Sequence, residues 1–189
     1  MTTSDSRVAA LILPGLSSSG PEHWQTIWEQ QDPACIRVAQ KEWETPLCAD
    51  WVSTLDDAVA ASEETVVLVA HSSSCALVAH WARDASADNL ARVRGALLVA
   101  PSDPEGLNYP VGPTGFAPMP LVRLPFPSIV VASRDDRYVT MERAREYADS
   151  WGSELVDVGD AGHINSASGL GSWSTGYGLL QRLRMSAPS

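Results

Sequence analysis

Short apolar runs without polar alternation recur along this chain, and they constrain its fold more than any other feature. The clearest is TVVLVA at residues 65–70. A strand that is apolar on both faces must be covered on both faces, which is typical of parallel sheets between layers of helices. Five further strands are predicted at residues 8–13, 35–39, 95–100, 128–133 and 154–158.

Amphipathic segments separate these strands and predict helices at residues 21–31, 48–62, 74–85, 141–151 and 173–184. The first helix should hold Pro21 in its opening turn, with Ser19 or Gly20 as its cap. The alternation predicts an α/β protein, a three-layer α/β/α sandwich around a mainly parallel sheet of about six strands. Because the 189 residues show no linker-like stretch, we expect a single domain over residues 1–189.

Charge and composition exclude several classes of partner. The 13 Lys and Arg against 23 Asp and Glu give a net charge of -10, which repels nucleic acids and anionic membrane surfaces. The longest apolar runs are too short to span a bilayer, and the N-terminus lacks the basic segment of a signal peptide. The three cysteines and four histidines show no ligand spacing. We therefore expect a cytoplasmic protein with no metal, no cofactor, and neither nucleic acid nor membrane as a partner.

Ligands bind such a sheet at the carboxyl ends of its strands. The strand at residues 65–70 runs through AHSSS at residues 70–74 into a predicted helix. This is the layout of a nucleophile elbow, G-x-S-x-G, with Ala70 and Ser74 in the places of the glycines. Such a turn would hold Ser72 in a strained conformation with its hydroxyl above the sheet. The alternative is a serine-rich loop that only caps the helix.

Two more strand ends add a candidate acid and a candidate base. Asp136 follows the strand at residues 128–133, and His163 follows the strand at residues 154–158. An acid can hold an imidazole in the right tautomer, and a loop histidine can act as a general base. Taken singly, each is more often an ordinary turn or loop residue. The chain order Ser72, Asp136, His163 is that of α/β-hydrolases, so the three together predict a catalytic triad.

Backbone N–H groups should complete this site as an oxyanion hole. One donor is expected at Ser73 and the other at Leu16 or Ser17, in the loop after the first strand, although that loop could also be a simple turn before a helix. Candidate pocket walls near these donors and the His163 loop are His23, Trp24 and Trp173. For the first two, a partly buried pair at a helix start is an equal alternative.

The irregular segment at residues 101–127 holds 8 of the 13 prolines, so no long helix can form there. Long segments of this kind in compact domains are usually functional. We expect the segment to cover the acyl site. Its apolar residues Tyr109, Phe116 and Met119 favour a small hydrophobic or aromatic acyl group.

Five segments carry a resemblance to a known family: residues 13–25, 69–82, 99–106, 124–139 and 151–173. In them the chain resembles the small α/β-hydrolases of the retinoblastoma-binding-protein-9 / YdeN type, in particular the bacterial branch. The resemblance implies a compact, lidless α/β-hydrolase core. It also implies Ser72 as the nucleophile, His163 as the base and Asp136 as the acid, with Asp135 as the alternative acid.

The chain departs from the family at the elbow, which is usually G-H-S-x-G. The extra Cβ atoms of Ala70 and Ser74 could crowd the turn and lower activity. The Leu-x-Cys-x-Glu motif of the human relative is absent, so no retinoblastoma-type binding is expected. Beside Ser72, we expect His71 to point into supporting structure and Cys75 to be a buried core residue rather than a nucleophile.

These features predict a serine hydrolase, and within that class a carboxylesterase that cleaves small esters through an acyl-enzyme without a cofactor. One alternative is an amidase or peptidase with the same triad, because pocket shape selects the leaving group. The other is a catalytically weak module that binds a ligand or protein on the same fold, which the altered elbow favours.

Overall fold

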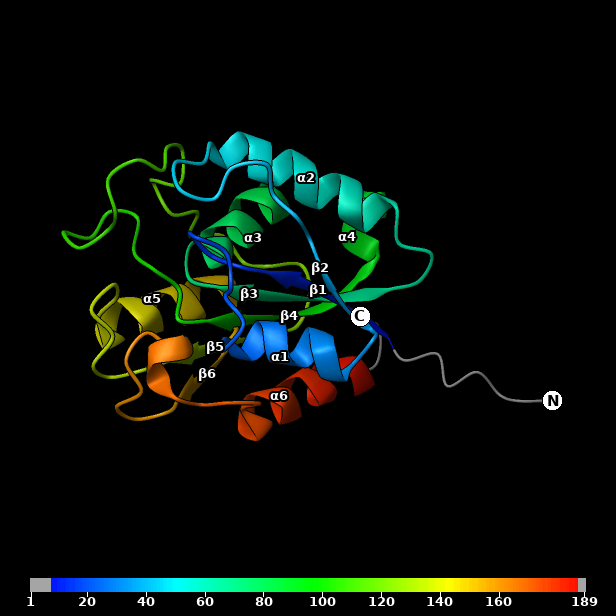
Figure 1. Cartoon of the computed structure of the whole chain (residues 1–189). Helices are drawn as coiled ribbons and strands as arrows, with labels where there is room; N and C mark the ends of the chain where they lie inside the picture. The colour runs from blue at the N-terminus through cyan, green and yellow to red at the C-terminus, as the bar shows by residue number, and fades with distance from the viewer. Residues whose placement is uncertain (1–7, 187–189) are drawn as a thin grey trace.

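The computed structural model describes residues 8–186 and contains a six-stranded sheet in the order β2-β1-β3-β4-β5-β6, with every neighbouring pair parallel (Figure 1). The strands are β1 Ala9–Leu13, β2 Cys35–Arg37, β3 Val66–His71, β4 Val93–Val99, β5 Ser128–Ala132 and β6 Glu154–Asp157. Because β2 and β3 lie on opposite sides of β1, the winding reverses there. The carboxyl ends of β1 and β3 therefore meet at a topological switch point, where ligands bind on sheets of this kind.

Helices cover both faces of the sheet. They are α1 Trp24–Gln31, α2 Cys48–Ala60, α3 Ser73–Asp84, α4 Ala87–Ala91, α5 Met141–Trp151 and α6 Ser174–Met185, with a 3-10 helix at Ser166–Ser168. Figure 1 shows α2 and α3 on one side of the sheet and α1 and α6 on the other. Buried side chains of α2, α3 and α5 pack in one core, and those of α1 and α6 pack in a second core. The predicted three-layer α/β/α fold is confirmed.

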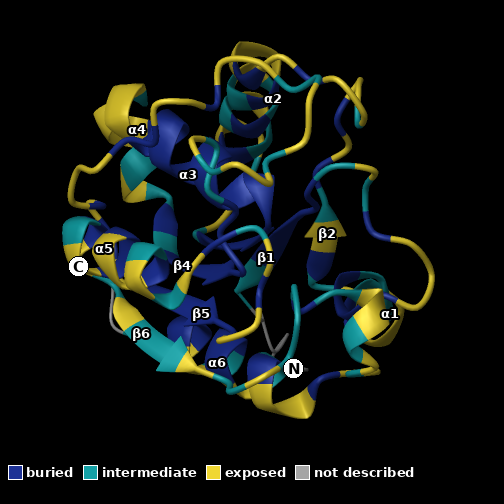
Figure 2. Cartoon of the chain, turned by 90° about the vertical axis from the view of Figure 1, so that its left-hand side faces the viewer, coloured by how far each residue is buried: buried dark blue, intermediate teal, exposed yellow. Residues whose placement is uncertain are grey.

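The two cores explain why the central strands are apolar throughout. In β3, Leu68 and Ala70 face the core of α2, α3 and α5, while Val67 and Val69 face the core of α1 and α6. All four side chains are fully buried. The edge strands β2 and β6 are partly exposed, as Figure 2 shows. Burial of each large aliphatic side chain contributes about 1.5–3 kcal/mol to the free energy of folding, so the central strands stabilise the sheet more than the edge strands do.

The helix predictions missed two features of the structure. The first helix begins at Trp24, not at Pro21, and its cap is His23, whose Nδ1 accepts the Gln25 N–H at 3.2 Å. The His23 N–H donates to the Gly20 carbonyl at 3.0 Å, so the chain makes a turn before the helix starts. The short helix α4 was not predicted, since five residues give no readable periodicity. No helix forms over residues 101–127, as the prolines predicted.

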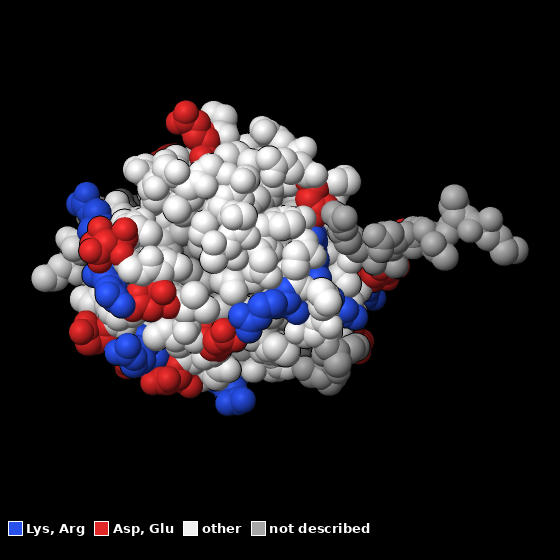
Figure 3. Space-filling model, turned by 90° about the horizontal axis from the view of Figure 1, so that it is seen from below, with Lys and Arg blue, Asp and Glu red and all other residues white. Residues whose placement is uncertain are grey.

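Positive and negative side chains alternate on the face that carries α6, which Figure 3 views from below. Charged side chains also pair with one another, such as Arg182 with Glu154 at 2.6 Å and Arg134 with Asp157 at 2.8 Å. Between residues 8 and 186, no helix combines the length and apolar character needed to cross a membrane.

Candidate active site

Ser72 lies in the sharp turn between β3 and α3, at φ 59° and ψ -126°. A positive φ is strained for a residue with a side chain, and strain of this kind concentrates at functional sites. The Ser72 N–H donates to the Val99 carbonyl of β4 at 3.0 Å, which fixes the turn to the sheet. The predicted elbow conformation is therefore present.

The two residues that replace the glycines of the elbow are both buried. Ala70 is fully buried, and Ser74 is 1% exposed. The Ser74 hydroxyl donates to the Pro14 carbonyl at 2.6 Å. Serine in this place therefore ties the elbow helix to the loop after β1, a contact that glycine could not make.

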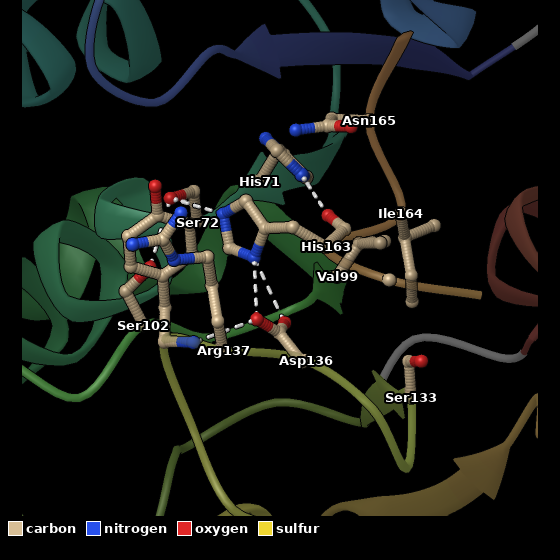
Figure 4. Close-up of polar contacts among 12 residues, drawn as sticks. His71, Ser72, Val99, Ser102, Ser133, Asp136, Arg137, His163, Ile164 and Asn165 are labelled. Atoms are coloured by element: carbon tan, nitrogen blue, oxygen red, sulfur yellow. Dashed lines mark hydrogen bonds and ion pairs between the residues drawn. The ribbon is translucent and has the colours of Figure 1, made fainter. Parts of the chain in front are cut away.

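His163 connects Ser72 to Asp136 (Figure 4). Its Nε2 lies 2.9 Å from Ser72 Oγ, and its Nδ1 lies 2.8 Å and 3.0 Å from the two Asp136 carboxylate oxygens. An ionised carboxylate only accepts hydrogen bonds, so Nδ1 carries the proton and Nε2 presents its lone pair to the Ser72 hydroxyl. The Asp136 side chain is 0% exposed, and the Tyr138 N–H donates to its Oδ1 at 2.9 Å.

Asp135, the alternative acid, has a different role. Its carboxylate accepts the Ser133 hydroxyl and the Gly162 N–H, each at 2.7 Å. These hydrogen bonds lower the pKa of Asp135. Ser133 Oγ also accepts the Ala161 N–H at 2.8 Å. Asp135 therefore holds the backbone that precedes His163, while Asp136 contacts the ring.

Two of the predicted oxyanion donors are free to bind an oxygen atom. The Ser17 N–H donates to the Trp43 carbonyl at 3.0 Å and is therefore occupied. The N–H groups of Leu16 and Ser73 make no hydrogen bond to any residue in the described part of the chain. Ser73 opens α3, where first-turn N–H groups have no partner within the helix. Both residues line the cavity at Ser72.

Two further histidines, His71 and His23, lie near His163. His71 Nε2 is 2.9 Å from the His163 carbonyl oxygen and so positions the His163 backbone, as expected of a supporting residue, but His71 also lines the cavity. Burial lowers the pKa of His71 well below its usual value, with the nearby His163 and His23 acting in the same direction. His23 packs edge-on against His71, with ring centroids 4.7 Å apart, and lines the cavity.

A family model described as serine hydrolase matches residues 10–182. The chain belongs to this serine hydrolase family. A solved YdeN-like hydrolase from Pectobacterium atrosepticum is 30% identical, with 94% of this chain and 91% of that chain covered at a TM-score of 0.81. The predicted resemblance to YdeN-like small hydrolases is confirmed.

More distant structures share the fold of this serine hydrolase. The ydeN product of B. subtilis is 18% identical over 93% of this chain and 98% of that chain, with a TM-score of 0.70. An esterase of Thermogutta terrifontis with butyrate bound is 18% identical over 96% of this chain and 84% of that chain, with a TM-score of 0.66. No curated protein matches the chain.

The cavity of the hydrolase has a volume of about 440 Å³, and several small polar residues line part of it. These include Ser17, Ser18, Ser102, Asn165 and Ser166. No Lys, Arg, Asp or Glu lines it among the described residues, and the same residues contain no His, Cys, Asp and Glu cluster that could hold a metal ion.

Trp24 and Trp173 do not line this cavity, so that prediction was wrong. Both are buried between α1 and α6, with ring centroids 5.1 Å apart. Trp24 Nε1 donates to the Ile164 carbonyl at 2.8 Å. Both rings face the second core, and Trp24 supports the loop of His163 through this hydrogen bond.

The segment at residues 101–127 covers the cavity less than expected. Phe116 and Met119 are buried in the core of α2, α3 and α5, because the segment folds down onto that layer. Tyr109 donates its hydroxyl to Ser73 Oγ at 3.1 Å, and Pro110 lines the cavity. The predicted preference for an aromatic or hydrophobic acyl group therefore loses two of its three supporting residues.

Sequence reasoning missed Ser102, whose Oγ lies 2.9 Å from Ser72 Oγ (Figure 4). Ser102 follows the end of β4, and β4 is the neighbour of β3 in the sheet. A polar residue just past a strand adjacent to the elbow is the signal that could have found it. That signal depends on the strand order, which the sequence did not provide.

Proposed function

We propose that this serine hydrolase is a carboxylesterase that cleaves small, uncharged esters through an acyl-enzyme on Ser72. The observation that carries the proposal is the hydrogen-bonded series Ser72 Oγ, His163 Nε2, His163 Nδ1 and Asp136, with distances of 2.9 Å and 2.8 Å. A nucleophile, a base and an orienting acid within hydrogen-bond reach are the requirements for nucleophilic acyl transfer.

The proposed reaction has two steps. Ser72 Oγ attacks the ester carbonyl carbon while its proton passes to His163 Nε2, and the carbonyl oxygen accepts hydrogen bonds from the Leu16 and Ser73 N–H groups. His163 then protonates the leaving alkoxide, and the alcohol departs. Water next attacks the acyl carbon, gives a proton to His163, and releases the acid as the proton returns to Ser72. Asp136 stabilises the imidazolium in both steps.

The cavity supports the substrate class. Its volume of about 440 Å³ falls in the lower part of the range for small-molecule sites, about 300–1,000 Å³. The lining has no Lys, Arg, Asp or Glu among the described residues, so none of these side chains would compensate a charged acyl group after desolvation. We therefore expect acetyl and butyryl esters to react faster than long-chain esters.

The first experiment is labelling with a fluorophosphonate, followed by mass spectrometry of the modified peptide. We expect stoichiometric labelling at Ser72, none in Ser72→Ala, and strong reduction in His163→Ala. Ser128→Ala is a matched control, since Ser128 is a buried serine at the start of β5, away from the site. A folded wild-type chain that stays unlabelled would overturn the proposal and favour the binding module.

Substrate preference is tested separately, with p-nitrophenyl acetate, butyrate and decanoate and with the anilide of the preferred acid. The proposal predicts that kcat/KM falls from the short esters to decanoate and is lower still for the anilide. Faster cleavage of the anilide would replace the esterase with an amidase.

A further inference from the structure

Ser72 Oγ has two hydrogen-bond partners, His163 Nε2 and Ser102 Oγ, each at 2.9 Å. We propose that Ser102 is a further catalytic residue, whose hydroxyl donates to Ser72 Oγ and stabilises the negative charge that develops there when the acyl-enzyme forms and breaks down. This inference rests on the proposed function of Ser72 as the nucleophile.

The direction of the bond follows from proton positions. The Asp136 carboxylate accepts from His163 Nδ1, so the unprotonated Nε2 accepts the Ser72 proton. With its proton directed at His163, Ser72 Oγ can only accept from Ser102. Within residues 8–186, Ser72 Oγ is also the sole hydrogen-bond partner of Ser102 Oγ. The Ser102 hydroxyl therefore donates its hydrogen bond to Ser72 Oγ.

The backbone around Ser102 is fixed on both sides. Ala100, two residues earlier, has φ 48° and donates its N–H to the Val131 carbonyl at 2.8 Å. A positive φ at a residue with a Cβ is strained and persists only when the surroundings impose it. Asp103, the next residue, donates its N–H to the Tyr138 carbonyl at 3.0 Å.

The Asp103 side chain adds a second anchor on α5. Its carboxylate accepts the Tyr147 hydroxyl at 2.8 Å and lies 3.3 Å from the Arg143 guanidinium. Ser102 itself is 3% exposed. A buried hydroxyl held between two anchored residues costs little reorganisation when charge develops beside it, which is the condition for effective electrostatic stabilisation.

The contribution changes along the reaction. As His163 takes the Ser72 proton, Oγ gains negative charge and the hydrogen bond from Ser102 strengthens. In the acyl-enzyme, Oγ is an ester oxygen with less charge, so the bond weakens. When water has attacked and the bond from Oγ to the acyl carbon breaks, the electron pair returns to Oγ, and Ser102 donates again until His163 returns the proton. Ser102 neither gains nor loses a proton.

The experiment compares Ser102→Ala with Ser102→Thr, which keeps the hydroxyl, and with Ser128→Ala. Ser128 is the control because it is a buried serine that also pairs with a serine, with Oγ 2.6 Å from Ser153 Oγ in a partly buried contact, but it lies at the start of β5, whereas Ser72 follows the end of β3. The rate constant of fluorophosphonate labelling and kcat/KM for p-nitrophenyl acetate are measured, together with the urea unfolding midpoint. If Ser102→Ala does not fold, Ser102→Cys replaces it, since a thiol keeps the shape with a weaker donor.

We expect Ser102→Ala to be roughly tenfold slower in both assays, as for loss of one hydrogen bond to a charged group. Ser102→Thr should recover part of the rate, and Ser128→Ala should react at the wild-type rate even where its stability falls. A wild-type rate in Ser102→Ala, or an equal loss of rate in Ser128→Ala, would overturn the proposed role of Ser102 but would leave the proposed function of Ser72 standing. Absence of labelling in the folded wild-type chain would instead overturn the proposed function, and the role of Ser102 with it.

Discussion

Gly15 leaves room for Ser72 because it has no side chain: a Cβ at residue 15 would lie 2.7 Å from Ser72 Cβ and 3.3 Å from Ser72 Oγ. Ser72 cannot easily move away, since its turn is held by the hydrogen bond to Val99. The loop after β1 therefore lies so close to the elbow after β3 that residue 15 has no room for a side chain, and Leu16 and Ser73 line the same cavity.

Gly15→Ala should displace the Ser72 hydroxyl and reduce kcat/KM for p-nitrophenyl acetate more than about tenfold, since a misplacement near 1 Å can cost about 10²-fold. Gly178→Ala is the control, because a Cβ at that position in α6 meets no atom within 4 Å. Wild-type kcat/KM in Gly15→Ala would contradict the close approach.

Asp136→Asn should reduce kcat by roughly 10⁴-fold, as loss of the orienting carboxylate does in serine proteases. Asp135→Asn should reduce it less than about tenfold, because that residue holds the loop and does not contact the ring. The pair is a matched comparison of adjacent aspartates, assayed with the same short ester. A larger loss in Asp135→Asn would show that the two roles are reversed.

Stability should fall between pH 6.5 and pH 4 because of His23. Burial lowers the pKa of His23 to about 4, with Arg37 and His163 adding to the effect. The unfolded chain, with a histidine pKa near 6.5, binds more protons in this range, so folding is most favoured above about pH 6.5 and weakens as the pH decreases. His23 alone contributes on the order of 3 kcal/mol. Urea unfolding at a series of pH values should show a shallower slope in His23→Gln; an unchanged slope would refute this.

Asp32 and Arg184 form a buried ion pair at 2.7 Å, with each side chain 3% exposed. Burial raises the pKa of Asp32, but hydrogen bonds from Arg184 and Tyr177 outweigh it and lower the pKa to about 2. Asp32→Ala leaves the Arg184 charge buried and should cost about 3–5 kcal/mol in the free energy of unfolding.

The control for this pair is Glu154→Gln, which removes the exposed pair with Arg182 and should cost less than about 1 kcal/mol. Both variants are measured by urea unfolding at pH 7. Equal costs would contradict the expectation that the Arg184 charge is expensive when it is left buried without its partner.

Local sequence patterns determined the three layers of this protein and which residues follow the ends of its strands. Runs such as the one in β3 are buried on both faces, so their composition alone requires helices on both sides. The positions of Ser72, Asp136 and His163 after three strands followed from the same patterns, since parallel strands present their carboxyl ends at one edge.

Only the tertiary structure decided which of the residues near the strand ends contact one another. It separated Asp136 from Asp135, assigned the Ser17 N–H to Trp43, and moved Trp24 and Trp173 into the core. It also placed Ser102, which follows β4, beside Ser72, which follows the neighbouring strand β3. The physical reason is that burial of a strand on both faces leaves a continuous apolar run in the sequence. Contacts between loops depend instead on the strand order and on the direction of each side chain, which can differ between adjacent residues such as Asp135 and Asp136.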